Sequence, residues 1–249
     1  MVGGSSGMAA AMTIRSHAVR LLRFAQDVVF PYTCAACGVE GEVLCAACRS
    51  SITLSGSGEC VFCGDASVGG ATCDTCHGAH ALDGLTAAAA YHNAVLRASI
   101  GRWKYHFQAL LGEVLGGYVV RSLTPAFWSL MDRTNAIVIP IPLHPYRLRY
   151  RGFNQAEQLA RAIGEAYALP VSCDILVRFR LHRSQAHKTH EKRLALKNPF
   201  KVLPSDILIG KTVVLVDDVA TTGTTLDHAA AVLKQAGSAC VWSVTLAKG

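Results

Sequence analysis

Residues 213–225 have the sequence Val213-Val-Leu-Val-Asp217-Asp218-Val-Ala-Thr221-Thr222-Gly223-Thr224-Thr225, and this stretch decides the fold. Its apolar run shows no polar alternation, which predicts a strand over 212–217 that is buried on both faces of a sheet. A helical pattern follows over 225–235 and ends at Gly237. The acidic pair and the polar turn therefore lie at the carboxyl end of a strand, where open α/β sheets bind ligands.

The turn after this strand has the chemistry of a phosphate cradle, because it offers hydroxyls, a flexible glycine and the amides of a helix N-terminus. The carboxylates just before it can accept hydrogen bonds from ribose hydroxyls or hold a hydrated Mg²⁺. A side chain at Gly223 is expected to obstruct the approach of the phosphate. We predict Asp217 and Asp218 as the catalytic pair. The predicted binding loop consists of Ala220, Thr221, Thr222, Gly223, Thr224 and Thr225.

Three other interpretations of this stretch explain less. A Walker B strand needs a Walker A loop after another strand, but Gly210-Lys211-Thr212 precedes its strand, and Ser205 stands where the first glycine belongs. A receiver-type acidic pair would lie at an early strand and would leave the phosphate loop unexplained. A purely structural cap would use Thr and Asp, but it does not account for five consecutive loop positions of this chemistry.

The segments around this stretch alternate between strand and helix. Strands are expected at 86–91, 136–141, 175–179, 212–217 and 241–246. Helices are expected at 16–30, 94–105, 108–131 with a break at Thr124-Pro125, 155–167 and 225–235. This order predicts an α/β domain with a parallel sheet and helices on both faces.

Eight of the 10 cysteines form four CxxC pairs near the N-terminus: Cys34, Cys37, Cys45, Cys48, Cys60, Cys63, Cys73 and Cys76. Reduced thiols at such spacing predict metal binding before a disulfide framework or a single redox pair. The run is a repeat, CAACG with CAAC and then CVFCG with CDTC, and each repeat can bind one Zn²⁺ through four thiolates. The segment is too short to fold on apolar burial alone, so two structural zinc ions would supply folding energy.

The spacing leaves the pairing of the zinc ligands open. Sequential pairing within each repeat is the preferred hypothesis, and interleaved pairing of Cys34/Cys37 with Cys60/Cys63 is the alternative. His77 and His80 offer substitute ligands that four thiolates per site make unnecessary.

Composition limits the class of protein. With 249 residues, 51% hydrophobic and 16% charged, the chain should fold into a globular core with a small second module. Its richest apolar stretch, 107–131, contains Glu113, Arg121 and Pro125, so no membrane span is expected. No secretory signal is apparent, and we expect a cytoplasmic protein.

The formal net charge is +7. Basic side chains gather between 178 and 201, where Glu191 is the only acid: Arg178, Arg180, Arg183, Lys188, Lys192, Arg193, Lys197 and Lys201. Such a stretch suits a polyphosphate ligand or single-stranded DNA, although a solvated basic loop has the same composition.

The order of motifs resembles one family. The cysteine pairs are followed by Trp103-Lys104-Tyr105, Ile139-Pro-Ile-Pro-Leu-His144, Arg151-Gly-Phe-Asn154-Gln155, Gln185 with the basic stretch, and finally VVLVDDVATTGTT. The last motif resembles the phosphoribosyl pyrophosphate (PRPP) signature of type I phosphoribosyltransferases. The whole, from Cys34 onward, resembles the ComF family (competence protein F), which joins a double zinc ribbon to such a domain.

The resemblance implies three parts, a tail with an amphipathic helix at 1–33, a double zinc ribbon at 34–80 and a phosphoribosyltransferase-like domain at 81–249. The segment 142–155 would form a pyrophosphate loop that binds PRPP through Arg151, Gly152, Asn154 and Gln155. The stretch after Arg180 would resemble a mobile catalytic hood. One departure is Ala195, which stands where the family often has an asparagine after the hood arginine.

The resemblance also implies a function. Mg²⁺ with PRPP would be the ligand, an unidentified acceptor would receive the phosphoribosyl group, and the partners would be competence or DNA-processing proteins that act in DNA uptake. The alternative function is a single-stranded nucleic-acid-binding accessory protein that keeps a vestigial PRPP site.

Overall fold

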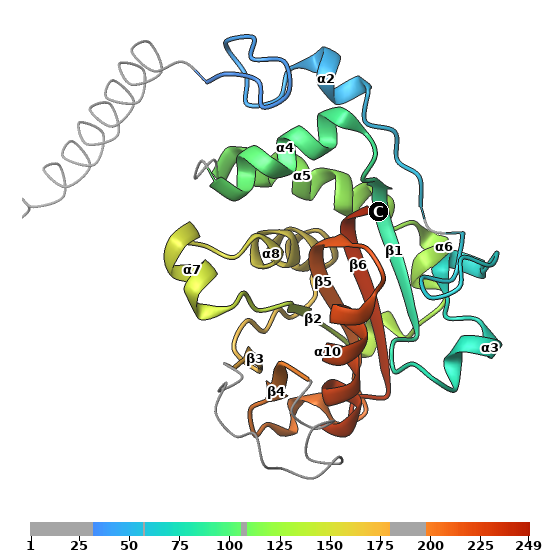
Figure 1. Cartoon of the computed structure of the whole chain (residues 1–249). Coiled ribbons are helices and arrows are strands. Elements are labelled where there is room, and N and C mark those ends of the chain that lie inside the picture. The colour runs from blue at the N-terminus through green and yellow to red at the C-terminus, as the bar shows by residue number, and fades with distance from the viewer. Residues whose placement is uncertain (1–31, 57, 106–108, 180–197) are drawn as a thin grey trace, which may run out of the picture.

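A four-stranded parallel sheet forms the centre of the computed structural model, which describes residues 32–56, 58–105, 109–179 and 198–249 (Figure 1). The strand order is β1-β6-β5-β2, with every neighbouring pair parallel. The strands are β1 (Gly84–Ala90), β6 (Cys240–Lys248), β5 (Thr212–Ala220) and β2 (Ala136–Pro140). The parallel sheet predicted from the alternating segments is therefore confirmed, and the predicted helix at 16–30 lies outside the described residues.

The apolar run of β5 supplies both faces of the sheet. Val214 and Val216 pack into one core cluster, whereas Val213 and Leu215 pack into another. All four side chains are fully buried. The absence of polar alternation in this strand follows directly from burial on both faces.

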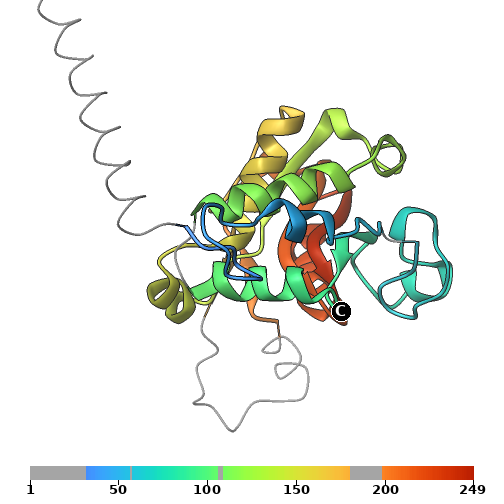
Figure 2. The ribbon, with the colours of Figure 1, turned by 90° about the horizontal axis from the view of Figure 1, so that it is seen from above.

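Helices cover both of these faces (Figures 1 and 2). On one side lie α4 (Ala94–Tyr105), α5 (Ala109–Ser122) and α8 (Gln155–Tyr167), and on the other lies α10 (Thr224–Gln235). The break expected near Thr124 is confirmed, because α5 ends there and the Thr124 hydroxyl caps the short α6 (Pro125–Trp128). The predicted helices at 94–105 and 155–167 have the predicted bounds.

Two features differ from the prediction. The segment at 175–179 forms β3 (Leu176–Arg178), which does not join the parallel sheet but pairs antiparallel with the unpredicted β4 (Phe200–Val202). The segment after β2 forms a helix, α7 (Pro145–Arg151), that begins at the His144 cap and ends at Gly152 with φ 77°. Its side chains are mostly exposed, so it lacks the apolar periodicity by which helices are predicted.

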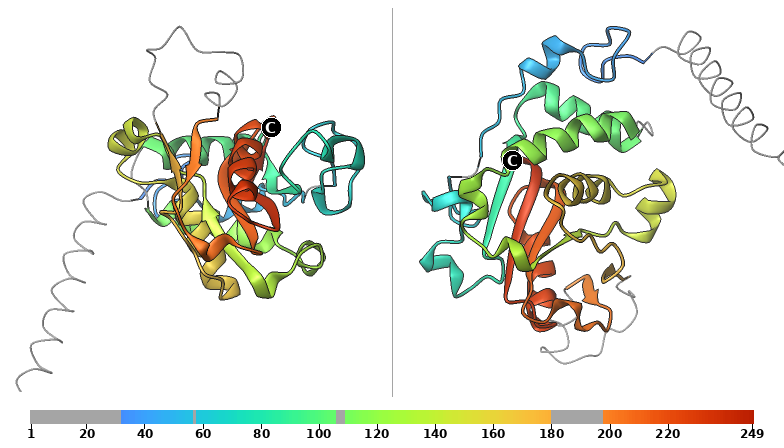
Figure 3. Two further views of the ribbon diagram at one scale, coloured as in Figure 1. Left: turned by 90° about the horizontal axis from the view of Figure 1, so that it is seen from below. Right: turned by 180° about the vertical axis from the view of Figure 1, so that it is seen from behind.

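The two cysteine repeats pack at different places, the first against α4 and α5 and the second beside β1 (Figures 1 and 3). The first knuckle (residues 34–48) contains α2 (Ala46–Ser50) in part and lies on the side of α4 and α5 that faces away from the sheet, where Leu44 joins the core cluster of these helices (Figure 1). The second knuckle (residues 60–76) contains the 3₁₀ helix η1 (Val68–Gly70) and most of α3 (Asp74–His77), and it contributes Val61 to the α10 side.

Chain segments from the knuckle region run along the outer edge of β1. The amide of Ser55 donates to the carbonyl of Ala88 over 3.1 Å, and the amide of Thr72 donates to the carbonyl of Asp83 over 2.8 Å. Two further 3₁₀ helices, η2 (Arg133–Asn135) and η3 (Asp206–Leu208), precede β2 and β5. Within the described ranges no helix is long and apolar enough to cross a membrane.

Candidate ligand site and metal centres

The acidic pair lies where β5 runs past the end of its neighbour. Pro140, the last residue of β2, is paired with Val216, so Asp217 is the first residue of β5 beyond that strand. Burial, and then the charge of Asp218, raise the pKa of Asp217 to about 7. The two predicted catalytic carboxyl groups thus share one end of a buried strand, and the charge of Asp218 opposes the ionisation of Asp217.

Asp218 is paired with a lysine from a distant helix. Its Oδ2 lies 2.5 Å from Nζ of Lys104, in the last turn of α4, and its backbone amide donates to Oδ1 of Asp217 over 2.8 Å. Lys104 belongs to the motif Trp103-Lys104-Tyr105, but its sequence context does not predict a place in the site. Only the fold brings α4 to the end of β5, because more than a hundred residues separate the two partners.

The predicted phosphate loop forms the turn between β5 and α10. Gly223 caps the helix with φ 73°, a backbone conformation that favours glycine, as expected. Thr221, Thr222, Thr224 and Thr225 are exposed, and the hydroxyls of Thr222 and Thr224 lie 2.9 Å apart. Ala220, in contrast, is 3% exposed and belongs to the core, so its side chain is turned away from a ligand.

The structure gives a reason for glycine at position 223 that the sequence did not predict. A Cβ atom at Gly223 would lie 3.1 Å from Cγ2 of Val61 and 3.3 Å from Cε1 of Phe62. It would therefore meet the second knuckle. The loop and a zinc module pack closely at this position, and no local sequence pattern could show such a contact.

Several residues of the predicted pyrophosphate segment have structural roles. Asn154 caps α8 through its Oδ1 and donates from Nδ2 to the carbonyl of Ile141 over 3.0 Å. Gly152 ends α7. Gln155 is 1% exposed, and its Oε1 accepts from a guanidinium nitrogen of Arg151 over 3.3 Å, while its Nε2 has no partner among the described residues. Of these four residues, Arg151 lines an open pocket to which the other three do not contribute.

That pocket measures about 500 Å³ and lies between α4 and α7. Its lining is basic and aromatic without a single acid: Tyr91, Ile100, Gly101, Lys104, Tyr105, Tyr146, Arg147, Tyr150 and Arg151. Because Lys104 lines this pocket and also contacts Asp218, the acidic pair lies next to the pocket. A pocket of this kind can bind a strongly anionic group.

Arg178 also faces this site from the end of β3. Burial, and then the charge of Arg147, lower the pKa of its guanidinium, while the carboxylate of Asp217 has the opposite effect. Arg178 is the first residue of the basic stretch, and its position in the sequence predicts no specific contact. Lys201 lies in β4, whereas residues 180–197 of that stretch, including Gln185 and Ala195, lie outside the described residues.

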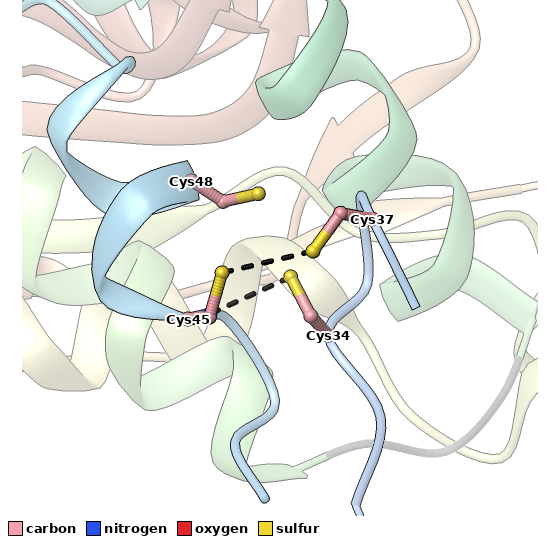
Figure 4. A group of neighbouring side chains, drawn as sticks. All are labelled: Cys34, Cys37, Cys45 and Cys48. Carbon is pink, nitrogen blue, oxygen red and sulfur yellow. Dashed lines mark hydrogen bonds between the residues drawn. The ribbon is translucent and has the colours of Figure 1, made fainter. Parts of the chain in front are cut away.

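The cysteines gather in two clusters with sequential pairing. One cluster consists of Cys34, Cys37, Cys45 and Cys48 (Figure 4), and the other of Cys60, Cys63, Cys73 and Cys76. This arrangement excludes the interleaved alternative. The two histidines contact carboxylates and do not belong to the clusters. Nδ1 of His80 lies 3.0 Å from Oδ2 of Asp227, and Nε2 of His77 lies 3.4 Å from Oδ1 of Asp83.

Both clusters fit zinc. The sulfurs of Cys37 and Cys45 lie 3.7 Å apart, and those of Cys63 and Cys73 lie 3.6 Å apart. Four thiolates around Zn²⁺ at about 2.3 Å would be separated by about 3.8 Å. The donor set and its spacing therefore match two structural zinc ions.

Local electrostatics also suit a cation in the first cluster. Burial opposes ionisation of Cys34, but backbone amides, led by that of Cys37, lower its pKa to about 6. Burial and then the neighbouring sulfurs raise the pKa of Cys48 to about 12. One thiolate forms readily and the next does not, so four thiolates together require a metal ion.

Comparison with known domain families agrees with this two-part design. Residues 25–77 match the family described as "Double zinc ribbon domain", and residues 148–249 match "Phosphoribosyl transferase domain". The fold and the cysteine clusters thus define a protein that joins a double zinc ribbon to a phosphoribosyltransferase domain.

Three relatives give the family. The chain is 29% identical over 157 residues to "Competence protein ComFC" of Streptococcus pneumoniae, over 63% of this chain and 65% of the relative. It is 28% identical to "Competence protein F" of Haemophilus influenzae (55% and 61%) and 27% identical to "Competence protein ComFC" of Bacillus subtilis (82% and 84%). It thus spans less than two thirds of the length of the first two relatives. The chain belongs to the ComF family.

Among solved structures, one that resembles the chain is glutamine PRPP amidotransferase from B. subtilis complexed with ADP and GMP. The likeness covers 62% of this chain and 28% of that one, with 18% identity and a TM-score of 0.38.

Proposed function

We propose that this protein binds PRPP together with Mg²⁺ at the carboxyl end of β5 and transfers its phosphoribosyl group. The observation that carries the proposal is the ion pair between Asp218 and Lys104. It joins the exposed threonines that follow β5 to the basic pocket between α4 and α7. A molecule with a phosphate at one end and a pyrophosphate at the other needs two anion sites with acceptors for ribose hydroxyls between them.

Each part of the site has a role in this proposal. The amides and hydroxyls of residues 221–225 would bind the 5′-phosphate at the N-terminus of α10. Asp217 and Asp218 would accept hydrogen bonds from the ribose hydroxyls, and Arg147 and Arg151 would neutralise the pyrophosphate. Mg²⁺, held by these carboxylates or by the ligand itself, would supply further charge neutralisation.

The chemistry requires positioning more than proton transfer. Departure of pyrophosphate from C1 leaves an oxocarbenium-like state, which is stabilised by fixed charges and by orientation. The described part of the site accordingly needs no nucleophile or acid–base dyad. The acceptor would enter on the side of C1 opposite to the leaving group.

The names of the relatives extend the proposal to biology. Besides the competence proteins, two relatives are called "DNA utilization protein YhgH". We therefore place this chain in DNA uptake, with competence or DNA-processing proteins as partners. A cytoplasmic location would keep the eight clustered thiols reduced for zinc.

Calorimetric titration tests the proposal. PRPP with Mg²⁺ should bind the zinc-loaded protein, and Asp218→Asn should weaken that binding by roughly tenfold or more, since hydrogen bonds to charged groups contribute about 1.5–3 kcal/mol. Absence of PRPP binding at millimolar concentration would contradict the proposal.

A second candidate function is single-stranded DNA binding with a vestigial PRPP site. It is favoured by α7, where Tyr146 and Tyr150 are each 68% exposed beside three arginines. Exposed aromatic rings between cations stack on bases and hold the backbone of a single strand. This function would give DNA binding that persists in Asp218→Asn while PRPP binding is absent from the wild type.

A further inference from the structure

The two zinc knuckles differ in the residues between their first two ligands. The first has Ala35 and Ala36 between its cysteines, whereas the second has Val61 and Phe62. Two alanines suffice for a CxxC turn, as the first knuckle shows, so the larger pair is not required to bind zinc. What the larger side chains contact therefore indicates their purpose.

Val61 and Phe62 lie against the predicted phosphate loop. Cγ2 of Val61 and Cε1 of Phe62 come within 3.1 Å and 3.3 Å of the position that a Cβ atom would take at Gly223. Val61 is 8% exposed and belongs to the same core cluster as Leu226, in the first turn of α10. The second knuckle thus packs under the turn whose outer side carries the exposed threonines.

A second connection runs through polar groups. The ring of Phe62 stacks on His80 with centroids 3.5 Å apart and an interplanar angle of 3°. Nδ1 of His80 lies 3.0 Å from Oδ2 of Asp227, and Oδ1 of Asp227 accepts the amides of Ala81 and Leu82 over 2.7 and 3.1 Å. Asp227 donates its own amide to the carbonyl of Gly223 over 2.9 Å. The first turn of α10 is therefore anchored to the second knuckle at two places.

We propose that Val61 and Phe62 are positioning residues that hold the loop 221–225 in its ligand-binding shape, and so couple the second zinc site to phosphate affinity. This inference rests on the proposed function of the loop. A cradle of backbone amides binds an anion only while its amides converge, and apparent affinity falls with the fraction of molecules in that shape. The first knuckle packs against α4 and α5 instead and should not affect the loop.

The test removes the contact between the second knuckle and the loop but leaves the zinc ligands unchanged. The double substitution Val61→Ala with Phe62→Ala gives the second repeat the Ala-Ala turn of the first. Val68→Ala is the matched control, because Val68 lies in the same knuckle but is 78% exposed. Zinc content is measured first, and Phe62→Ala alone replaces the double variant if the latter binds fewer than two ions.

Two measurements follow on the zinc-loaded proteins. Hydrogen–deuterium exchange of peptides covering 218–230 reports opening of the loop without any ligand. Calorimetry with ribose 5-phosphate reports the phosphate subsite alone, since this probe lacks pyrophosphate. We expect faster exchange and roughly threefold to tenfold weaker binding in the double variant, and neither change in Val68→Ala.

The outcomes separate the two proposals. Unchanged exchange in the double variant would overturn the positioning role, and so would faster exchange with unchanged affinity. Absence of ribose 5-phosphate binding by the wild type would instead overturn the proposed function of the loop. In that case the exchange experiment would still show whether the knuckle holds the loop.

Discussion

Asp217 is placed in surroundings that disfavour its charge. Burial at the end of β5 and the neighbouring Asp218 raise its pKa to about 7, and Lys104 and Arg178 offset only part of this effect. A carboxyl group that is partly protonated near neutrality accepts ribose hydroxyls more strongly, and attracts Mg²⁺, once it has lost its proton. Binding of a cationic cofactor with PRPP would supply the free energy for that ionisation.

The raised pKa of Asp217 predicts a definite pH dependence of stability. The folded state holds the proton on Asp217 more tightly than the unfolded state does. The stabilisation that this proton provides is therefore full below pH about 4 and is lost as the pH rises to about 7. Urea unfolding gives the free energy of unfolding of the wild type and of Asp217→Asn. The wild-type value minus the variant value should fall over this pH range, by at most about 1.4 kcal/mol per pH unit. A difference that rises with pH would contradict the prediction.

Arg151 is expected to act on pyrophosphate only. It lines the basic pocket, where its guanidinium lies 5.4 Å from the centre of the Tyr105 ring. It belongs to α7 and not to the phosphate loop at residues 221–225. Arg151→Ala should weaken PRPP binding by about tenfold or more and leave ribose 5-phosphate binding unchanged. Arg149→Ala, on an exposed position of the same helix that does not line the pocket, is the control. Equal losses for both ligands would refute this division of roles.

At the scale of elements, the first knuckle is joined to the helices that cover the sheet. The hydroxyl of Tyr118 donates to the carbonyl of Arg49 over 2.9 Å, and the guanidinium of Arg102 donates to the hydroxyl of Thr33 over 3.1 Å. Cys34 and Leu44 are fully buried in the cluster that contains α5. Loss of this zinc site should therefore disturb more than the knuckle itself.

The purified protein should contain two zinc ions per chain, and Cys34→Ser should retain one. Because Cys34 shares a core with α5, this variant should also lower the free energy of unfolding of the whole chain by at least about 2 kcal/mol. Cys173→Ser is the control, since Cys173 is exposed and belongs to neither cluster. Metal analysis and thermal unfolding measure both effects, and a zinc-free wild type prepared under reducing conditions would disprove the expectation.

The sequence was sufficient for elements whose signals are local. Apolar periodicity placed α8, the repeat placed the two zinc clusters, and the polar turn placed the loop around Gly223. It was insufficient where contacts are distant, as for Lys104 with Asp218, because no pattern in α4 indicates a partner in β5. The short α7 and β4 were missed because they bury too little surface to leave a periodic pattern.

For the whole molecule, the net charge of +7 favours polyanions. Binding of single-stranded DNA should weaken steeply between low and moderate salt, because phosphate contacts release condensed counterions. Fluorescence anisotropy with a labelled oligonucleotide across a salt series measures the slope. An affinity that does not change with salt would remove the electrostatic basis of this prediction.

The strand order has a consequence for synthesis of the chain. β1 has β6 as its sheet partner, and β6 is the last of the described strands to leave the ribosome. The edge of β1 that pairs with β6 therefore stays unpaired while β2 and β5 are made, and unpaired strand edges are prone to aggregation. The knuckle segments that pair with the outer edge of β1 are already made by then, and zinc is needed to fold the knuckles. Zinc supply during translation should therefore affect how much nascent protein reaches the native state.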